Sequence, residues 1–213
     1  MTDWTRQLSI FNPDDFNEWV TLIGAGAIGS STALMLCKLG LKNIIIYDFD
    51  KIEPHNLPNQ LYFTNQVGKN KAEALKYVLE QFGEANVKTR GKFEKDSEIA
   101  SRIVIVATDN METRKIVFNA SKKASIFIDA RMGGQVYRLY TINPQNKEDC
   151  KFYEGTLYSD KEAVVEKCTE RSIIWNIFGI AAEIGCQLTK VLNKQEYKRY
   201  IVRDYVNTVM EYE

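Results

Sequence analysis

Residues 21–50 of the chain read TLIGAGAIGSSTALMLCKLGLKNIIIYDFD. An apolar run that begins at Val20 breaks at the glycine-rich segment GAGAIG, and apolar residues at helical spacing then follow up to Gly40. A second β-branched run ends at Asp48. The order of strand, glycine turn, helix and strand predicts a βαβ unit with a carboxylate where the second strand ends.

The glycine-rich segment has the spacing of a phosphate-binding turn. Gly24 allows the tight turn, Gly26 lets a phosphate approach the backbone, and Gly29 lets the helix pack on the strand. The helix N-terminus presents free N–H groups to an anion, and Asp48 can accept hydrogen bonds from ribose hydroxyls. The glycines alone also fit a turn that merely requires glycine, but the ordered elements around them favour a nucleotide site, without saying which nucleotide. The expected ligand-binding residues of this unit are Gly24, Gly26, Ala27, Ile28, Gly29 and Asp48.

The composition predicts one globular domain, residues 1–213, without a bias toward a charged partner. The chain has 45% hydrophobic residues, and 28 basic residues balance 28 acidic ones. We therefore expect no nucleic acid partner and no membrane partner, and no apolar stretch is long enough to span a bilayer. The cysteines are scattered, with no CxxC pair and no secretory leader, which predicts a reduced, cytoplasmic protein without structural zinc. They are Cys37, Cys150, Cys168 and Cys186.

Two charged residues are expected at the same edge of the sheet as the glycine turn. Lys71 lies in the first turn of a predicted helix, residues 69–82, where the helix dipole disfavours a cation unless an anion binds there. Asp109 follows an apolar strand, residues 103–106, and so reaches the edge at which open α/β sheets bind ligands. Both residues also have plainer interpretations. Lys71 fits a solvated surface residue, and either Asp109 or Asn110 fits a helix N-cap.

The remaining pattern predicts a mixed sheet. Residues 126–128 and 136–142 are expected to form an antiparallel hairpin, and the tail, residues 200–212, adds one or two closing strands. The expected fold class is therefore α/β. It is a Rossmann-like, doubly wound mixed sheet with helices on both faces and a C-terminal antiparallel extension.

Three other segments complete the expected domain. Residues 1–18 form a packed N-terminal segment, and residues 143–171 form a long, crossover-type loop. A long helix, residues 172–192, starts with Ser172 as its N-cap and buries an isoleucine-rich face. Its small residues would let it pack closely on another helix.

Several motifs follow one another in the order found in a known family. They are Arg6-Gln7, the glycine turn, Asp48-Phe49-Asp50, His55-Asn56-Leu57-Pro58-Asn59-Gln60, Gly68-Lys69-Asn70-Lys71, Thr108-Asp109-Asn110 with Arg114, and Cys168-Thr169. Over most of its length the chain resembles the ThiF/HesA/MoeB family, the adenylating core shared by ubiquitin-activating and sulfur-carrier-activating enzymes. The element Asp129-Ala130-Arg131 and the Cys-Thr pair are similar to those of short bacterial and phage members.

The resemblance implies an ATP-dependent adenylyltransferase. In the family, the C-terminal glycine carboxylate of a ubiquitin-like or sulfur-carrier protein attacks the α-phosphate of ATP and gives an acyl-adenylate and pyrophosphate. Both reactants are anionic, so such a site requires positioning and positive charge around the phosphates.

The resemblance also implies a role for each matching residue. Asp109 binds Mg²⁺, Lys71 contacts phosphate, and Asp48 holds the ribose. Arg6 completes the site from the other subunit of a homodimer. The remaining residues implied to line the nucleotide are Asp50, Asn56, Asn59, Gln60, Thr108 and Asn110.

Two departures from the family pattern leave alternatives open. The arginine with which the family contacts ATP phosphate falls on Asn59, and the two CxxC zinc pairs are absent. Asn59 therefore suggests a pseudoenzyme subunit that scaffolds an active partner. The retained Lys71, Asp109 and Arg6 argue against it. An NAD or FAD oxidoreductase would share the glycine turn and Asp48, but it would not explain Asp50, Lys71 and Asp109 together.

Cys168 is the expected nucleophile if the acyl group passes to the protein. It follows the predicted loop and precedes a helix start, a setting that can activate a thiol. A thioester on Cys168 and a plain packing role both stay open. Cys37, Cys150 and Cys186 are weaker candidates, and the helical patterns around Cys37 and Cys186 predict that both are buried.

Overall fold

The computed structural model describes residues 2–158 and 172–213. Its centre is one eight-stranded sheet with the order β3-β2-β1-β4-β5-β6-β7-β8. The strands are β1 (Val20–Ile23), β2 (Asn43–Tyr47), β3 (Asn86–Arg90), β4 (Ile103–Val106), β5 (Ile126–Gly133), β6 (Val136–Ile142), β7 (Tyr200–Asp204) and β8 (Val209–Tyr212). The first five strands in this order are parallel, and β6, β7 and β8 continue the sheet in antiparallel pairs. The predicted mixed sheet with its C-terminal antiparallel extension is confirmed.

The strand order reverses beside β1. The chain passes from β1 to β2 and β3 on one side and then crosses to β4 on the other side of β1. All residues of β1 and β4 are buried, as expected for central strands covered on both faces. The point at which the strand order reverses is where open α/β sheets bind ligands, outside the carboxyl ends of the strands.

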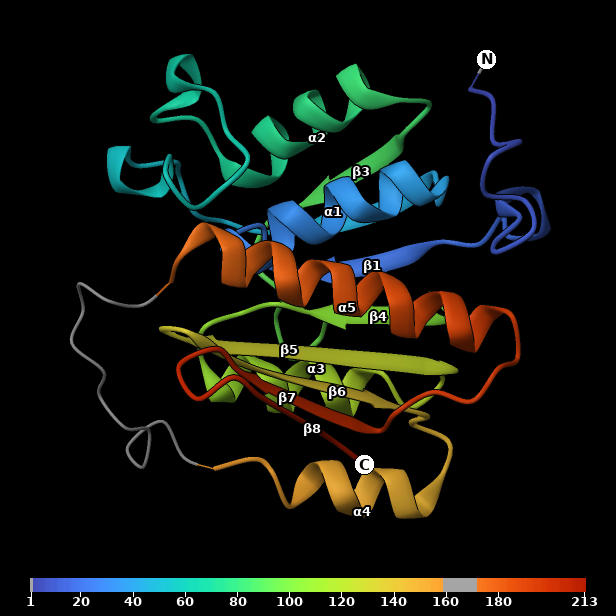
Figure 1. Cartoon of the computed structure of the whole chain (residues 1–213). Coiled ribbons are helices and arrows are strands. Elements are labelled where there is room, and N and C mark those ends of the chain that lie inside the picture. The colour runs from blue at the N-terminus through green and yellow to red at the C-terminus, as the bar shows by residue number, and fades with distance from the viewer. Residues whose placement is uncertain (1, 159–171) are drawn as a thin grey trace.

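Helices cover both faces of the sheet. One hydrophobic core contains α1 (Ala27–Leu39), α2 (Lys71–Phe82) and α5 (Ile174–Leu192), and a second contains α3 (Met111–Ala120) and α4 (Lys147–Glu154). Successive residues of β4 alternate between the two cores, because neighbouring strand residues point to opposite faces. Figure 1 shows α5 alongside α1 on one face and α4 apart from them. Within residues 2–158 and 172–213, no helix has both the length and the apolar character that a bilayer span requires.

A helix lies within the segment that we expected to be a long loop. α4 begins after Asn146, whose side chain accepts hydrogen bonds from two backbone N–H groups of the first turn. Tyr153 is fully buried against the rings of Phe118 and Phe127. One buried aromatic side chain and one N-cap therefore hold α4. Sequence reasoning looks instead for apolar residues that recur at helical spacing. The loop prediction was wrong for residues 147–154, and residues 159–171 lie outside the described part of the chain.

The start of α5 also differs from the prediction. Its N-cap is Ile173, which makes no side-chain cap. Ser172 instead lies in extended backbone and forms a parallel bridge with Gly134, so it is one residue too early to cap the helix. Close packing on another helix is confirmed, because a Cβ on Gly185 would lie 2.9 Å from Cγ of Met35 in α1.

Candidate functional site

The glycine turn joins β1 to α1 at the carboxyl edge of the sheet. Gly24 has a φ of 98°, and a Cβ there would lie 2.6 Å from the carbonyl oxygen of Ala107, which follows β4. A Cβ on Gly29 would lie 1.9 Å from the Gly24 carbonyl oxygen. Gly29 is therefore required chiefly by the turn itself, and not by the strand as we expected. A Cβ on Gly26 would meet no atom of a non-neighbouring described residue within 4 Å, so Gly26 borders open space.

The first turn of α1 faces the same space. Its N-cap is Gly26, and no side chain caps the helix. The N–H groups at the start of α1, those of Ala27 and Ile28 among them, are therefore available to a ligand. A helix N-terminus carries partial positive charge and binds anions.

Asp48, after β2, is tied to the glycine turn. Its Oδ2 accepts a hydrogen bond from the N–H of Ala25 at 2.7 Å, and its Oδ1 accepts one from the N–H of Asp50 at 2.8 Å. Burial raises the pKa of Asp48 above its ordinary value, although the two N–H groups and Lys71 favour the ionised form. The carboxylate therefore joins the end of β2 to the start of the turn.

Lys71 is the first residue of α2 and is 8% exposed. It is thus not the solvated surface lysine of the plainer interpretation. Its Nζ donates to Oδ2 of Asp50 at 3.1 Å, and this ion pair offsets the unfavourable position of a cation at a helix N-terminus. The Asp50 side chain is 50% exposed, so an incoming anion can compete with it for the ammonium group.

Asn110, and not Asp109, caps α3. The Oδ1 of Asn110 accepts a hydrogen bond from the N–H of Thr113 at 2.7 Å. The Asp109 side chain is exposed at the end of β4, and no described residue donates a hydrogen bond to its carboxylate. The carbonyl of Thr108 accepts a hydrogen bond from Arg114. Arg114 therefore fixes the backbone next to Asp109, whose negative charge also acts on the Arg114 guanidinium group.

The residues around Asp109 fit a Mg²⁺ ion that is held jointly by the protein and a substrate phosphate. No group of three or more His, Cys, Asp or Glu side chains that could hold a metal ion exists within residues 2–158 and 172–213. In phosphoryl-transfer sites Mg²⁺ is held by one or two carboxylates together with water and substrate phosphate oxygens. One exposed carboxylate at the same edge of the sheet as the open space at Gly26 matches that arrangement.

The loop after β2 lies over the first half of α1. Oγ of Ser30 in α1 accepts a hydrogen bond from the N–H of Leu61 at 3.2 Å. Asn56 is buried, and its Oδ1 accepts a backbone N–H within its own turn at 2.9 Å. Asn59 and Gln60 are half-buried, and Oε1 of Gln60 is buried without a partner in the described part of the chain. Contacts of Asn56, Asn59 and Gln60 with a nucleotide stay predictions.

A surface hollow of about 230 Å³ adjoins Asp48. Its lining residues are Asp48, Asn70, Glu73, Thr89, Arg90 and Gly91. Sequence reasoning missed the contributions of Glu73, Thr89 and Arg90 because the sequence does not show that the first turn of α2 lies beside the end of β3, where Thr89 donates a hydrogen bond to Glu73. The available signal was the position of Arg90 at the end of β3, since a strand parallel to β2 must end at the same edge.

A buried cluster of charges behind this edge was also missed. Asp129 is fully buried and accepts hydrogen bonds from Arg114, from Nε of Arg131 at 2.7 Å and from the hydroxyl of Tyr153 at 2.9 Å. Arg131 also donates to the carbonyl and the hydroxyl of Thr156. Burial, and next the charge of Arg131, lower the pKa of Arg114 to about 10. The cluster joins β5, α3 and the end of α4 into one unit.

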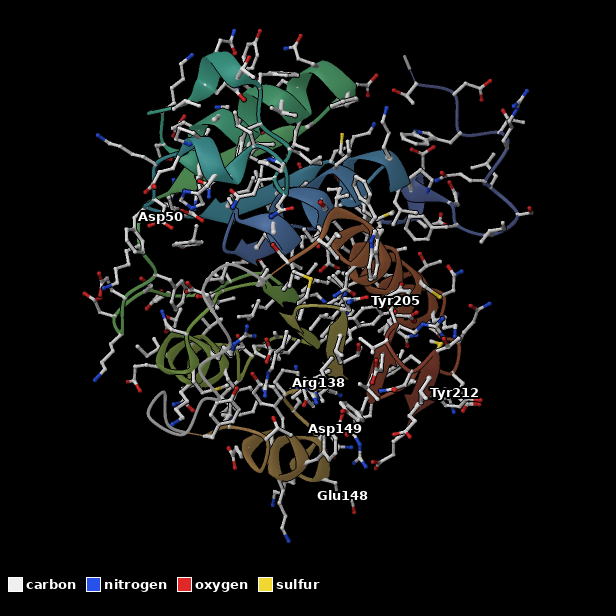
Figure 2. The ribbon with its side chains drawn as sticks, turned by 60° about the vertical axis from the view of Figure 1, so that its left-hand side comes forward. Asp50, Arg138, Glu148, Asp149, Tyr205 and Tyr212 are labelled. Atoms are coloured by element: carbon white, nitrogen blue, oxygen red, sulfur yellow. The ribbon has the colours of Figure 1, made fainter. Side chains whose placement is uncertain are left out.

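Arg6 lies far from this edge of its own chain. Nε2 of Gln7 donates to the carbonyl of the last residue of α1 at 3.0 Å, and Nδ2 of Asn193 donates to the carbonyl of Ile10 at 2.7 Å. The N-terminal segment is therefore fixed at the C-terminal ends of α1 and α5. The glycine turn is at the opposite end of α1, roughly 20 Å away for a helix of 13 residues. Figure 2 shows Asp50 and the N-terminal segment on opposite sides of the molecule, so Arg6 cannot reach the site in its own chain.

The cysteines do not gather at the site. Cys37 is buried in α1, as expected, and burial raises the pKa of its thiol. Cys186 is exposed on α5, and its predicted burial was wrong because it lies on the face opposite the isoleucines that pack on the sheet. Cys168 falls outside the described residues, so its role stays a prediction.

A family model described as the ThiF family matches residues 13–211, which begin ahead of β1 and end within β8. The chain belongs to the ThiF family. The resemblance inferred from its motifs is thus confirmed.

The chain is also similar to individual proteins, to one by sequence and to another by structure. Ubiquitin-like modifier-activating enzyme 5 of Culex quinquefasciatus is 32% identical over 126 residues, which are 50% of this chain and 32% of that protein. This chain therefore spans about a third of that relative. MccB, described as a microcin C7 biosynthetic enzyme in complex with N-formylated MccA, has a TM-score of 0.78 at 20% identity, covering 94% of this chain and 66% of that chain. Escherichia coli MccB with ATP gives a TM-score of 0.74 at 19% identity, covering 94% and 65%. These structures share the fold.

Proposed function

We propose that this chain is an ATP-dependent adenylyltransferase that activates the C-terminal carboxylate of a ubiquitin-like or sulfur-carrier protein as an acyl-adenylate. One observation carries the proposal. The glycine turn, Asp48, Lys71 and Asp109 lie together at one edge of the sheet in a chain of the ThiF family. A relative named for activating a ubiquitin-like modifier and a shared fold solved with ATP support this assignment.

In the proposed reaction, a carboxylate oxygen of the carrier bonds to the α-phosphorus of ATP. The bond from that phosphorus to the oxygen bridging to the β-phosphate breaks, and pyrophosphate leaves with its electron pair. The barrier is electrostatic, because one anion attacks another. The contribution of the protein is to hold the two anions in line and to place positive charge around the phosphates.

The glycine turn and α1 receive the phosphates. The open space at Gly26 admits a phosphate group, and the uncapped first turn of α1 supplies N–H donors to its oxygens. Asp48 accepts hydrogen bonds from the ribose, which places the base toward the hollow of about 230 Å³ between β3 and α2.

Lys71 exchanges partners when the nucleotide binds. In the free protein Asp50 holds its ammonium group at 3.1 Å. A triphosphate carries more negative charge than Asp50 and can take over this ion pair, because the Asp50 side chain is half exposed and can turn to solvent. The buried stem of Lys71 keeps the ammonium group at the edge of the sheet during the exchange.

Asp109 is the residue that would hold Mg²⁺, together with phosphate oxygens and water. When bound, the ion would neutralise charge on the phosphates and on the departing pyrophosphate. Arg114 keeps the Thr108 carbonyl in place, and so fixes the backbone from which Asp109 projects.

The proposal includes a homodimer in which Arg6 serves the site of the partner subunit. The distance between the N-terminal segment and the site within one chain supports this arrangement. It also includes transfer of the acyl group from the adenylate to the Cys168 thiolate, which forms a thioester and releases AMP. The alternative without this step is direct transfer from the adenylate to an external thiol or amine.

A catalytically impaired subunit is the main competing function, because Asn59 replaces the arginine of the family pattern. The burial of Lys71 and its placement beside the glycine turn favour the enzyme, because a scaffold has no need for a buried cation at a helix N-terminus. An NAD or FAD oxidoreductase would leave the free carboxylate of Asp109 without a role.

Exchange of labelled pyrophosphate into ATP tests the proposed activity. The purified chain, with Mg²⁺ and a panel of small ubiquitin-like proteins that end in glycine, is expected to catalyse exchange with at least one carrier. Lys71→Ala and Asp109→Ala should each remove it, while their circular dichroism spectra stay native. Lys76→Ala in α2 and Glu112→Ala in α3 are matched controls that should exchange like the wild type. Undiminished exchange in both site variants would refute the assignment.

Non-reducing gels test the thioester separately. Enzyme, carrier and ATP are expected to give a covalent adduct that thiol reagents release and that Cys168→Ser lacks. Cys150→Ser is the matched control. If Cys168→Ser leaves the adduct and overall transfer unchanged, the residue is structural and the enzyme stops at adenylation.

A further inference from the structure

A tyrosine in the loop after β2 is buried between the glycine turn and α2. Tyr62 is 8% exposed, and its ring belongs to the hydrophobic core that also contains α1 and α2. Its hydroxyl donates to the carbonyl of Ala25 at 2.5 Å, and the carbonyl of Lys71 lies 3.3 Å from the same oxygen. A hydroxyl has one proton to donate, so the shorter contact, with Ala25, is the main hydrogen bond. Tyr62 thus joins the glycine turn to the first residue of α2.

The Tyr62 hydroxyl is a fixed donor at neutral pH. The residue before it is tied to α1, because the N–H of Leu61 donates to Oγ of Ser30 at 3.2 Å. Burial, and next the charges of Asp48 and Asp50, raise the pKa of Tyr62 above its ordinary value. The hydroxyl therefore keeps its proton, and the position of the ring keeps that proton directed at the glycine turn.

The peptide bond between Ala25 and Gly26 depends on this one donor. The N–H of Ala25, in the preceding peptide, donates to Asp48. The carbonyl of Gly26, in the following peptide, accepts from the N–H of Ser30. Among the described residues, none but Tyr62 bonds to the carbonyl of Ala25 or to the N–H of Gly26. Because glycine has no Cβ, this peptide can rotate at little steric cost, and Tyr62 keeps it in one orientation.

The orientation of this peptide decides which atom faces the open space at Gly26. The C=O and N–H of a trans peptide point in opposite directions, and the described part of the chain has no cis peptide bond. The carbonyl of Ala25 points to Tyr62, so the N–H of Gly26 points away from Tyr62. A peptide rotated by half a turn would reverse the two groups. A carbonyl oxygen would then repel phosphate oxygens where an N–H attracts them.

We infer that Tyr62 is a positioning residue, which holds the N–H of Gly26 in the orientation that binds a phosphate of the nucleotide. The inference rests on the proposed function, because that function assigns the space at Gly26 to ATP. Tyr62 acts through the backbone of the glycine turn and not by contact with the nucleotide. Its second contact, with the carbonyl of Lys71, gives the turn and the start of α2 a shared support.

Calorimetric titration of Tyr62→Phe with ATP and with adenosine gives the first test. Phenylalanine keeps the buried ring and removes only the hydroxyl, so the peptide loses the bond that orients it. The Kd for ATP should rise about three- to tenfold, the factor that one hydrogen bond contributes to an equilibrium constant. The Kd for adenosine, which has no phosphate, should stay unchanged, whereas a general loosening of the site would weaken both ligands equally.

Tyr77→Phe is the matched control, since Tyr77 is an exposed tyrosine on α2. It should bind ATP and adenosine as the wild type does. Unchanged ATP affinity in folded Tyr62→Phe, or an equal loss of affinity for ATP and adenosine, would overturn the inference.

Glycine-selective ¹⁵N labelling tests the orientation of the peptide even if Tyr62→Phe fails to fold. The chain has 12 glycines, and Gly26→Ala identifies the amide signal of Gly26 by removing it. In the wild type, saturating ATP should move the Gly26 amide proton downfield, as a new hydrogen bond to a phosphate oxygen requires, and adenosine should not. A Gly26 signal that stays in place while ATP binds would contradict the assigned orientation.

Pyrophosphate exchange separates the failure of this inference from the failure of the proposed function. A wild type that binds ATP through the Gly26 amide but exchanges no pyrophosphate with any carrier would refute adenylation and leave the role of Tyr62 standing. A wild type that exchanges pyrophosphate, with unchanged ATP affinity in Tyr62→Phe, would refute the role of Tyr62 and leave the activity standing. A wild type that binds no ATP would refute both.

Discussion

Alanine at Gly29 adds one methyl group where the glycine turn has no room for it. The added Cβ would lie 1.9 Å from the carbonyl oxygen of Gly24 and 2.7 Å from its carbonyl carbon. These are backbone atoms, which cannot rotate away as a side chain can, so the turn or α1 has to move. Overpacking costs about 1–3 kcal/mol, whereas alanine in a helix gains about 0.5–1 kcal/mol over glycine. We expect the free energy of unfolding to fall by about 1 kcal/mol, which for a chain of this length lowers Tm by about 2–4 °C.

Alanine at Gly26 is the matched variant in the same turn. Its Cβ would meet no non-neighbouring described atom within 4 Å, and its φ of −75° suits alanine. We therefore expect a free energy of unfolding within about 0.5 kcal/mol of the wild type. The methyl group would instead occupy the space proposed for a phosphate, and the Kd for ATP should rise about tenfold or more, which is about 1.4 kcal/mol of binding free energy.

Thermal unfolding followed by circular dichroism and calorimetric titration with ATP measure the two effects. The steric argument fails if Gly29→Ala is as stable as the wild type. The proposed phosphate position fails if folded Gly26→Ala binds ATP with unchanged affinity.

Three further predictions concern buried groups. Asp129→Asn leaves the guanidinium groups of Arg114 and Arg131 without their carboxylate, and the free energy of unfolding from urea titration should fall by about 3–5 kcal/mol. Tyr153→Phe removes only the hydroxyl that donates to Asp129, and the same titration should give a smaller loss of about 1–3 kcal/mol; an equal loss in both variants would contradict the charge argument. Burial raises the pKa of Asp48 above its ordinary value of 3.8, so the folded state binds this proton more tightly than the unfolded state does. The wild type should therefore lose stability relative to Asp48→Asn as pH rises from 3.8 to the raised pKa, and should show a constant difference above it; a difference with the opposite slope would refute this.

The centre of the parallel sheet could be predicted from the sequence because β1, β2 and β4 are apolar runs rich in β-branched residues. The same runs end at Gly24, Asp48 and Asp109, and parallel strands bring their carboxyl ends to one edge. The position of the candidate site therefore follows from topology alone.

Other contacts of the site could not be predicted, because they depend on side-chain direction. The bond from Ala25 to Asp48 and the ion pair of Asp50 with Lys71 join segments whose spacing in the chain says nothing about distance. The Asp129 cluster was hidden for a different reason. From the sequence alone, a charged residue is expected to be exposed. Asp129 is instead fully buried and paired with two arginines.

Calorimetric titration of the purified chain with ATP and Mg²⁺, and separately with NAD⁺, tests most directly whether this edge of the sheet is an ATP site. We expect saturable binding of ATP at one site per subunit and no binding of NAD⁺. Lys71→Ala should keep its native circular dichroism spectrum and lose the ATP signal, whereas Lys76→Ala should keep both. Binding of NAD⁺ as tight as that of ATP, or unchanged ATP affinity in Lys71→Ala, would contradict the assignment.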